Sequence, residues 1–137
     1  MYSLSDKPFV FKSVNEMMET SFRNNWDRPA LSNYKGVTLS YHDVARRIAK
    51  LHIAFEQCGL KQGDKVAICS RNQANWAVAF LAGLSYGAVV VPLLHEFKSA
   101  NVHHLVNHSG ARLLFVDEII WAGLALAAMP GLKLAIK

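Results

Sequence analysis

The sequence predicts an α/β fold, in which alternating helices and strands form a mainly parallel sheet flanked by helices. From residue 40 onward, segments with helical spacing alternate with short uncharged runs. Strands that are apolar on both faces are typical of a parallel sheet covered by helices on both sides. The 137 residues, 52% of them hydrophobic and 18% charged, are enough for one globular domain. We expect a helix and a small hairpin over residues 1–39, and the sheet portion of the same domain over residues 40–137.

The first helix is expected to begin at a capping box. Ser13 and Glu16 have the spacing at which each side chain satisfies a backbone donor of the other residue. The apolar residues that follow share one face, which we expect to lie in the core and not against a cofactor: Val14, Met17, Met18 and Phe22. Residues 30–32 and 37–39 flank a Lys35-Gly36 turn, so they predict a hairpin.

A second capping box, made by Ser40 and Asp43, opens the most regular helix pattern in the chain. Its apolar stripe consists of Val44, Ile48, Leu51, Phe55 and Cys58. Gly59 stands where a helix commonly ends in a left-handed residue. Gly59 and Gly63 precede a strand, whereas phosphate-binding loops follow a strand and lead into a helix. We therefore interpret this segment as a helix end and a Gly-Asp turn.

The rest of the chain alternates strands with helices. We expect strands over residues 65–69, 88–91, 112–116 and 132–136. We expect helices to begin after a cap at Asn72 or Asn75, to run from Ser99 to near Gly110, and to cover residues 118–128.

Residues 76–94, WAVAFLAGLSYGAVVVPLL, contain no charged residue and are long enough to be considered as a membrane span. Their first half is rich in alanine and leucine, while the second half is β-branched and ends near Pro92. A helix, a turn at Gly87 and a buried strand explain this change better than one continuous helix. We therefore expect no transmembrane span.

Composition limits the other function classes. The net charge is +5, and the basic residues are scattered without a concentrated run, which disfavours nucleic-acid binding. Only two cysteines occur, neither in a CxxC pattern, and the N-terminus has no signal-peptide architecture. We therefore expect reduced thiols and a cytoplasmic location.

The residues give few candidates for chemistry. His104 and His108 have metal-ligand spacing on a helix, but without the HExxH pattern we favour solvent-facing or capping histidines and expect no metal site. Cys58 and Cys69 fit inert structural thiols. Ser70 and Asn72 follow a strand at the edge where open α/β sheets bind ligands, which makes them weak site candidates, with helix capping the favoured role.

The order of these features resembles the opening of the adenylate-forming (AMP-binding) enzymes, most of all the long-chain fatty acid–CoA ligases. The matching stretches are Leu39-Ser40-Tyr41, Gly59 with Gly63-Asp64-Lys65-Val66, Asn72 with Asn75-Trp76, Phe80-Leu81-Ala82, Gly87-Ala88-Val89-Val90-Val91-Pro92 and Ser109-Gly110-Ala111. The resemblance spans residues 28–118. It implies activation of a carboxylic acid with Mg-ATP as an acyl-adenylate, followed by transfer to coenzyme A.

The resemblance also limits what this chain can do alone. The family's Ser/Thr/Gly-rich phosphate loop ending in lysine is absent, so no catalytic, nucleotide-binding or metal residue is carried over. The chain is expected to be an N-terminal fragment, an incomplete domain that is inactive and holds no cofactor by itself, while ATP, Mg²⁺, coenzyme A and the fatty acid serve the full enzyme. The strand pattern that begins in LKLAIK without a closing helix agrees with this expectation.

His95 and Phe97 are hypothesised to lie in the wall of the acyl pocket. A fragment of this kind would expose apolar surface, which would favour self-association and allow peripheral membrane contact. The alternative hypothesis is a freestanding α/β binding or assembly module without catalysis.

Overall fold

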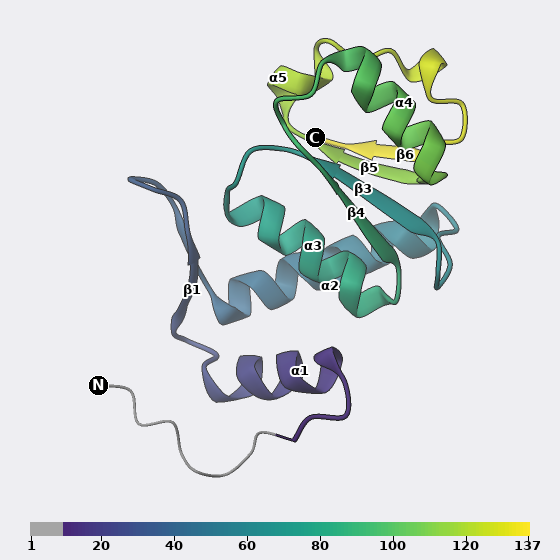
Figure 1. Cartoon of the computed structure of the whole chain (residues 1–137). Helices are drawn as coiled ribbons and strands as arrows, with labels where there is room; N and C mark the ends of the chain where they lie inside the picture. Colours follow the sequence, from purple (N-terminus) through teal and green to yellow (C-terminus); the bar gives the residue numbers. More distant parts are fainter. Residues whose placement is uncertain (1–9) are drawn as a thin grey trace.

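The structure, a computed structural model, describes residues 10–137 and contains a four-stranded parallel sheet between two layers of helices (Figure 1). The elements in chain order are α1 (Val14–Asn24), β1 (Pro29–Ser32), β2 (Thr38–Ser40), α2 (Tyr41–Gln57), β3 (Lys65–Cys69), α3 (Ala74–Tyr86), β4 (Val89–Leu93), α4 (Ser99–Ser109), β5 (Leu113–Val116), α5 (Glu118–Trp121), the 3₁₀ helix η1 (Leu126–Ala128) and β6 (Leu134–Ile136). The predicted α/β class is confirmed.

The strand order of the sheet is β4-β3-β5-β6, and all three neighbouring pairs are parallel. From β3 the chain moves to one side through α3 and β4, then crosses back through α4 to β5 on the other side. Connections between parallel strands are right-handed. The connection from β3 to β4 and the connection from β4 to β5 run in opposite directions across the sheet, so α3 and α4 lie on opposite faces. The direction of travel reverses between β3 and β5, which is the topological switch point of the sheet.

Each face of the sheet has its own core. Alternate residues of a strand point to opposite faces, so Val66 and Ile68 pack under α2 and α3, while Ala67 and Cys69 pack under α4. Figure 1 shows α2 and α3 below the sheet, and α4 and α5 above it. The fully buried side chains of the first core include Phe55, Val66 and Leu113; those of the second include Val102 and Leu114.

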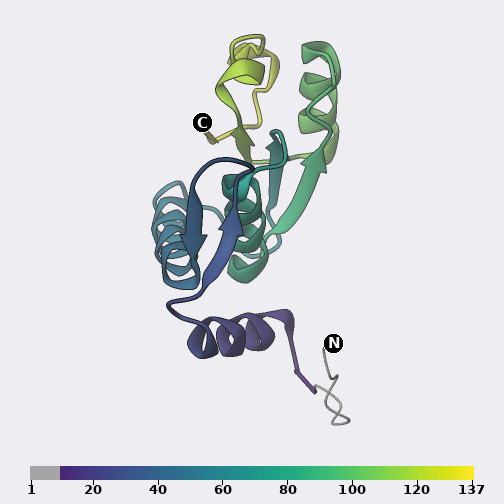
Figure 2. The same cartoon turned by 90° about the vertical axis from the view of Figure 1, so that its left-hand side faces the viewer.

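The hairpin of β1 and β2 lies beside α2, as Figure 2 shows, and its antiparallel pairing confirms the predicted hairpin. Lys35 adopts the left-handed conformation in the connecting turn, with φ of 52°. The capping box of α2 is complete, since Asp43 N donates to Ser40 Oγ at 3.2 Å and Ser40 N donates to Asp43 Oδ2 at 3.0 Å.

The first helix differs from its prediction in two respects. Ser13 caps it, but Glu16 accepts a hydrogen bond from Lys12 N at 2.7 Å, so the reciprocal half of the box is shifted by one residue. No residue of α1 is buried: Met18 and Phe22 pack against the core, whereas Val14 and Met17 are 47% and 42% exposed. The predicted core position of those two is wrong because α1 lies outside the sheet layers, next to α2 (Figure 1).

The predicted helix over residues 118–128 is also wrong. The chain forms the four-residue α5, a turn and then η1. Gly123 lies in the turn, where an added Cβ would come 2.8 Å from Ser99 Oγ of α4. The following segment is tied to α4 by Asn107 Nδ2, which donates to Ala128 O at 2.8 Å. These contacts outweigh the local helix propensity of the alanines and leucines.

The segment considered as a membrane span is divided into a helix, a turn and a strand as predicted. The strand is not the buried one expected, because β4 lies at the edge of the sheet and only its Leu93 is buried. The helix α3 ends at Tyr86, Gly87 takes the left-handed conformation with φ of 85°, and β4 begins at Val89. Among residues 10–137, no helix has the length and hydropathy needed to cross a membrane.

Candidate functional site

The loops at the carboxyl ends of β3 and β5 lie side by side at the switch point of the sheet. Cys69 pairs with Val116 in the parallel register, so the residues that follow them are brought together. Arg71 N donates to Asp117 Oδ2 at 3.3 Å, and Arg71 Nε lies 3.5 Å from the same oxygen. Open α/β sheets bind ligands at this edge. The sequence pattern predicted Ser70 at this edge but gave no sign that Asp117 contacts Arg71 there.

Asp117 has a structural role at this edge. Its side chain is 11% exposed, and its Oδ1 accepts a hydrogen bond from Ile120 N at 3.1 Å, which caps α5. Burial alone would raise the pKa of this carboxyl, but the amides of Ile120 and Arg71 and the Arg71 charge outweigh burial and lower the pKa. Asp117 is therefore ionised at neutral pH and holds the two loops together.

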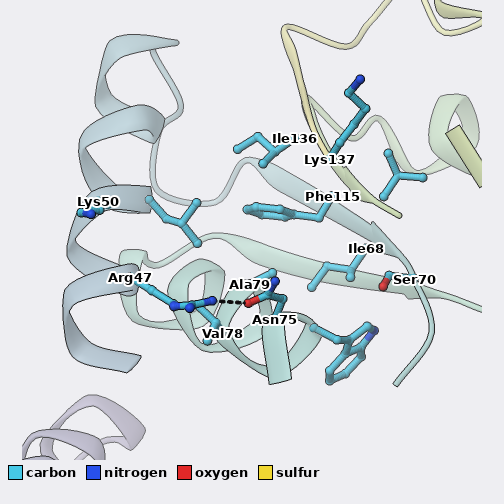
Figure 3. Close-up of a pocket in the computed structure, with 13 residues that line it drawn as sticks. Arg47, Lys50, Ile68, Ser70, Asn75, Val78, Ala79, Phe115, Ile136 and Lys137 are labelled. Atoms are coloured by element: carbon cyan, nitrogen blue, oxygen red, sulfur yellow. Dashed lines mark hydrogen bonds between the residues drawn. The ribbon is translucent and has the colours of Figure 1, made fainter. Parts of the chain in front are cut away.

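A cavity of about 310 Å³ opens beside these loops, between α2, α3 and the sheet (Figure 3). Its apolar lining consists of Leu51, Ile68, Trp76, Val78, Ala79, Phe115, Val116 and Ile136; its polar lining consists of Arg47, Lys50, Ser70, Asn75 and Lys137. The volume is at the lower end of the range for small-molecule sites.

The two helices are bridged at the cavity rim. Arg47 Nη1 of α2 donates to Asn75 Oδ1 of α3 at 2.6 Å, and both residues are exposed (Figure 3). Trp76 stacks on Phe80 one turn along α3, with ring centroids 5.3 Å apart. The lining side chains include three cationic residues and no acidic residue. The cavity therefore suits an apolar group that carries a negative charge.

The predicted cap of α3 at Asn72 or Asn75 is wrong. Gln73 is the N-cap and makes no side-chain capping bond; the amide of Ala74 donates instead to Asn33 Oδ1 of the hairpin at 2.7 Å. Asn75 is engaged by Arg47, and Asn72 is exposed and does not line the cavity. A contact between residues 41 positions apart leaves no local pattern in the sequence.

Ser70 lines the cavity, but its hydroxyl is used by the loop. Its Oγ donates to Arg71 O at 3.1 Å and accepts from Gln73 Nε2 at 3.2 Å. Both cysteines are free, and burial together with the nearby Asp117 charge raises the pKa of Cys69 to about 11. A thiol with this pKa is protonated at neutral pH, which agrees with the interpretation of Cys69 as an inert structural residue.

The hypothesised pocket-wall residues lie elsewhere. His95 and Phe97 belong to the segment between β4 and α4; His95 is exposed, and Phe97 packs against the core on the α4 face. Neither lines the cavity. Their proposed role stays a prediction about the full enzyme.

The histidines of α4 have two environments. His103 Nε2 accepts a hydrogen bond from Ala125 N at 3.0 Å and so helps to hold the segment after α5. His104 and His108 are exposed, and their rings stack with centroids 5.8 Å apart. Within residues 10–137 no group of three or more His, Cys, Asp or Glu side chains could hold a metal ion.

Comparison with known proteins identifies the family. The AMP-binding enzyme family matches residues 18–135. The chain belongs to this family. The match covers both core faces and most of the residues that line the cavity, so the fold described above is the family's architecture in this region.

The relatives include proteins with two kinds of activity. Long-chain-fatty-acid–CoA ligase 6 of Mus musculus is 32% identical over 105 residues, which are 72% of this chain and 15% of that protein. Surfactin synthase subunit 2 of Bacillus subtilis is 26% identical over 107 residues, which are 78% of this chain and 3% of that protein. The chain therefore spans less than a fifth of the length of these relatives.

Solved structures support the fold. A long-chain-fatty-acid–CoA ligase from Archaeoglobus fulgidus superposes with a TM-score of 0.79 at 18% identity, over 94% of this chain and 27% of that one. The N-terminal subdomain of Klebsiella oxytoca NpsA in complex with anthranilyl-AMSN gives a TM-score of 0.74 at 22% identity, over 92% of this chain and 31% of that one. At these identities the likeness shows the architecture alone.

Proposed function

We propose that this chain forms the amino-terminal part of an enzyme that activates a carboxylic acid with ATP as an acyl-adenylate and transfers the acyl group to coenzyme A. The observation that carries the proposal is the AMP-binding family match over residues 18–135. The short share of each relative that the chain spans supports a role as one part of a larger catalytic unit.

A fatty acid is the proposed substrate. Support comes from relatives named as long-chain-fatty-acid–CoA ligases in Mus musculus and Escherichia coli. Peptide synthetases are also among the relatives, and one solved structural neighbour is in complex with anthranilyl-AMSN, so amino acids and aryl acids are the competing substrate classes. Activity with fatty acids, amino acids and aryl acids therefore has to be compared to identify the acid.

The cofactors of the reaction are proposed to bind mainly outside this chain. The sequence has no phosphate loop of the family type, and no cluster of three metal-ligating side chains lies within residues 10–137. Mg²⁺ and the phosphates of ATP are therefore not assigned to residues of this chain. Its own contribution is the scaffold: a sheet whose carboxyl edge and adjacent cavity face the rest of the enzyme. The two free cysteines support a reducing, cytoplasmic environment.

The test is ATP–pyrophosphate exchange, measured for the 137-residue chain and for the protein translated from the whole reading frame. Fatty acids of several lengths, amino acids and aryl acids are each supplied with Mg²⁺. We expect exchange with a fatty acid by the longer protein and none by the 137-residue chain. Robust exchange by the short chain would contradict the fragment proposal, while exchange only with amino acids would exclude the fatty acid.

The pocket-wall proposal for His95 and Phe97 has its own test in the longer protein. His95→Ala and Phe97→Ala are compared with the unmodified enzyme across fatty acids of increasing length. A shift in the preferred length supports the proposal. An unchanged preference in both variants removes these two residues from the acyl pocket.

A freestanding binding module is the second candidate function, favoured by the cavity of about 310 Å³ with its cationic rim. An open reading frame that ends after Lys137 would support this candidate. A downstream Ser/Thr/Gly-rich loop containing lysine would support the enzyme.

A further inference from the structure

Contrary to the expectation from the sequence, we propose that His104 and His108 form a surface site for a divalent transition-metal ion, because their rings stack on the outside of α4. The proposal goes beyond the acyl-activating function and is independent of it. The sequence gives only the spacing of four residues. The structure adds that the two rings lie side by side, are exposed and have no other partner among residues 10–137.

The helix that carries the two histidines is held firmly. Val102 and Val106 of α4 are 0% and 1% exposed and pack onto the sheet. Gly110 closes the helix in the left-handed conformation, and its N–H donates to Val106 O and Asn107 O. His104 and His108 lie on the outward side of this anchored helix, so the helix backbone fixes the separation of their Cβ atoms while the rings can still rotate.

The two rings are free to bind an ion. Their centroids are 5.8 Å apart and their planes differ by 16°. Neither ring makes a hydrogen bond or ion pair with another residue in the part of the chain that the structure describes. A metal–nitrogen bond of about 2.1 Å requires the two donor nitrogens to approach within roughly 4 Å. Because both side chains are exposed, rotation about their side-chain torsions can achieve this approach.

The chemistry of the donors selects the class of ion. Imidazole nitrogen suits Zn²⁺, Ni²⁺ and Cu²⁺, whereas Mg²⁺ and Ca²⁺ prefer oxygen ligands. The helix itself contains no Lys, Arg, Asp or Glu, so it provides neither a competing carboxylate nor a repelling cation. His108 lies in the last turn, where the helix dipole favours positive charge. Water would complete the coordination of the bound ion.

His103 is the internal control for this site. It adjoins His104 in the sequence, but its Nε2 already accepts the hydrogen bond from Ala125 N. If any neighbouring histidines could bind the ion regardless of their geometry, replacing His103 would weaken the affinity as much as replacing His104 or His108. A site defined by the spacing of four residues depends on His104 and His108 alone.

The experiment is calorimetric titration of the 137-residue chain with Ni²⁺ at pH 7.5 in a non-coordinating buffer. Ni²⁺ is used because Cu²⁺ oxidises thiols and Cys58 is partly exposed. We expect one Ni²⁺ per chain. His104→Ala and His108→Ala should each bind at least about tenfold more weakly, because the second imidazole no longer binds intramolecularly. His103→Ala should retain the affinity of the natural chain.

The thermal midpoint provides a second readout. Ni²⁺ that binds the folded chain preferentially should raise Tm of the natural chain and of His103→Ala, but not of His104→Ala or His108→Ala. Circular dichroism without metal shows whether each variant is folded; both replaced side chains are exposed, so we expect that they are. Unchanged Ni²⁺ affinity in His104→Ala and His108→Ala, equal loss in His103→Ala, or no binding of Ni²⁺ to the natural chain would overturn the proposal.

Discussion

The two edges of the parallel sheet are built differently. At the amino edge the strands begin in turns tied by backbone hydrogen bonds: Gly63 N donates to Gly87 O at 2.8 Å, Val89 N to Asp64 O at 2.9 Å, and Arg112 N to Lys65 O at 2.9 Å. At the carboxyl edge, Arg71 and Asp117 join two loops, and a cavity opens beside them.

The packing beneath the edges differs in the same way. Near the amino edge, Phe55 packs against Tyr86 with ring centroids 5.3 Å apart, and Tyr86 Oη donates to Leu60 O at 3.1 Å. Near the carboxyl edge, the cavity of about 310 Å³ lies between α2, α3 and the same face of the sheet (Figure 3). We therefore expect the amino edge to contribute more to stability than the carboxyl edge, where the cavity leaves room for binding.

The largest effect is expected for Phe55→Ala. Phe55 is 0% exposed, so its truncation should lower the free energy of unfolding by about 3–5 kcal/mol. Leu51→Ala is the matched control, since Leu51 lies one turn earlier on α2 but lines the cavity and is only partly buried. It should cost about 1 kcal/mol. Urea unfolding measures both values, and equal losses would contradict the proposed difference between the edges.

A smaller loss is expected for Gly87→Ala at the amino edge. Gly87 has φ of 85°, a conformation that costs other residues roughly 1–2 kcal/mol, and an added Cβ would lie 3.0 Å from Gln62 Cγ. Gly131→Ala is the control, because its Cβ would meet no atom within 4 Å and its φ is not left-handed. If the two variants unfold at the same urea concentration, the left-handed turn is not a source of stability.

The sequence predicted the amino edge better than the carboxyl edge for a physical reason. Helix ends, left-handed glycines and apolar stripes are local, and Gly59, Gly87 and Phe55 occupy the places that their patterns indicated. The hairpin and the buried strands were predicted on the same basis. The resemblance to the AMP-binding enzymes agreed with these local features, and the family match confirms it at that level.

The errors occurred where distant contacts decide the structure. Asn33 replaces a local cap of α3, the segment after Asp117 follows contacts with α4 instead of helix propensity, and α1 has too few neighbours to bury Met17. The cavity was missed because its lining comes from four separate segments of the chain, 47–51, 68–79, 115–116 and 136–137. One available signal was the position of Arg47, one helical turn before Leu51 on the same side of α2.

Asp117→Asn should lower the free energy of unfolding by less than about 1 kcal/mol at pH 7. Asparagine can still cap α5, and the variant loses only the ion pair with the exposed Arg71. The lowered pKa of Asp117 means that its ionised form stabilises the fold above the usual carboxyl pKa. This contribution disappears as the pH falls through the lowered value. The variant should therefore lose less stability than the natural chain on acidification.

The acid dependence is measured by urea unfolding at pH 7 and at successively lower pH. Glu96→Gln serves as the control, since Glu96 is exposed and its side chain makes no hydrogen bond or ion pair within residues 10–137, and it should follow the natural chain at every pH. If Asp117→Asn loses stability on acidification as steeply as the natural chain, the carboxylate does not join the two loops in the way proposed.

The smallest effect on stability is expected at the cavity rim. Arg47→Ala combined with Lys50→Ala should change the free energy of unfolding by no more than about 0.5 kcal/mol, because both side chains are exposed and the bond from Arg47 to Asn75 joins two exposed groups. Urea unfolding measures this change. A loss of 2 kcal/mol or more would mean that the rim holds α2 and α3 together, as the turns of the amino edge hold the strands. A negligible loss would mean that the fold does not depend on the positive charges of Arg47 and Lys50. If the longer protein then needs these two residues for activity, the reason would be that they bind a ligand.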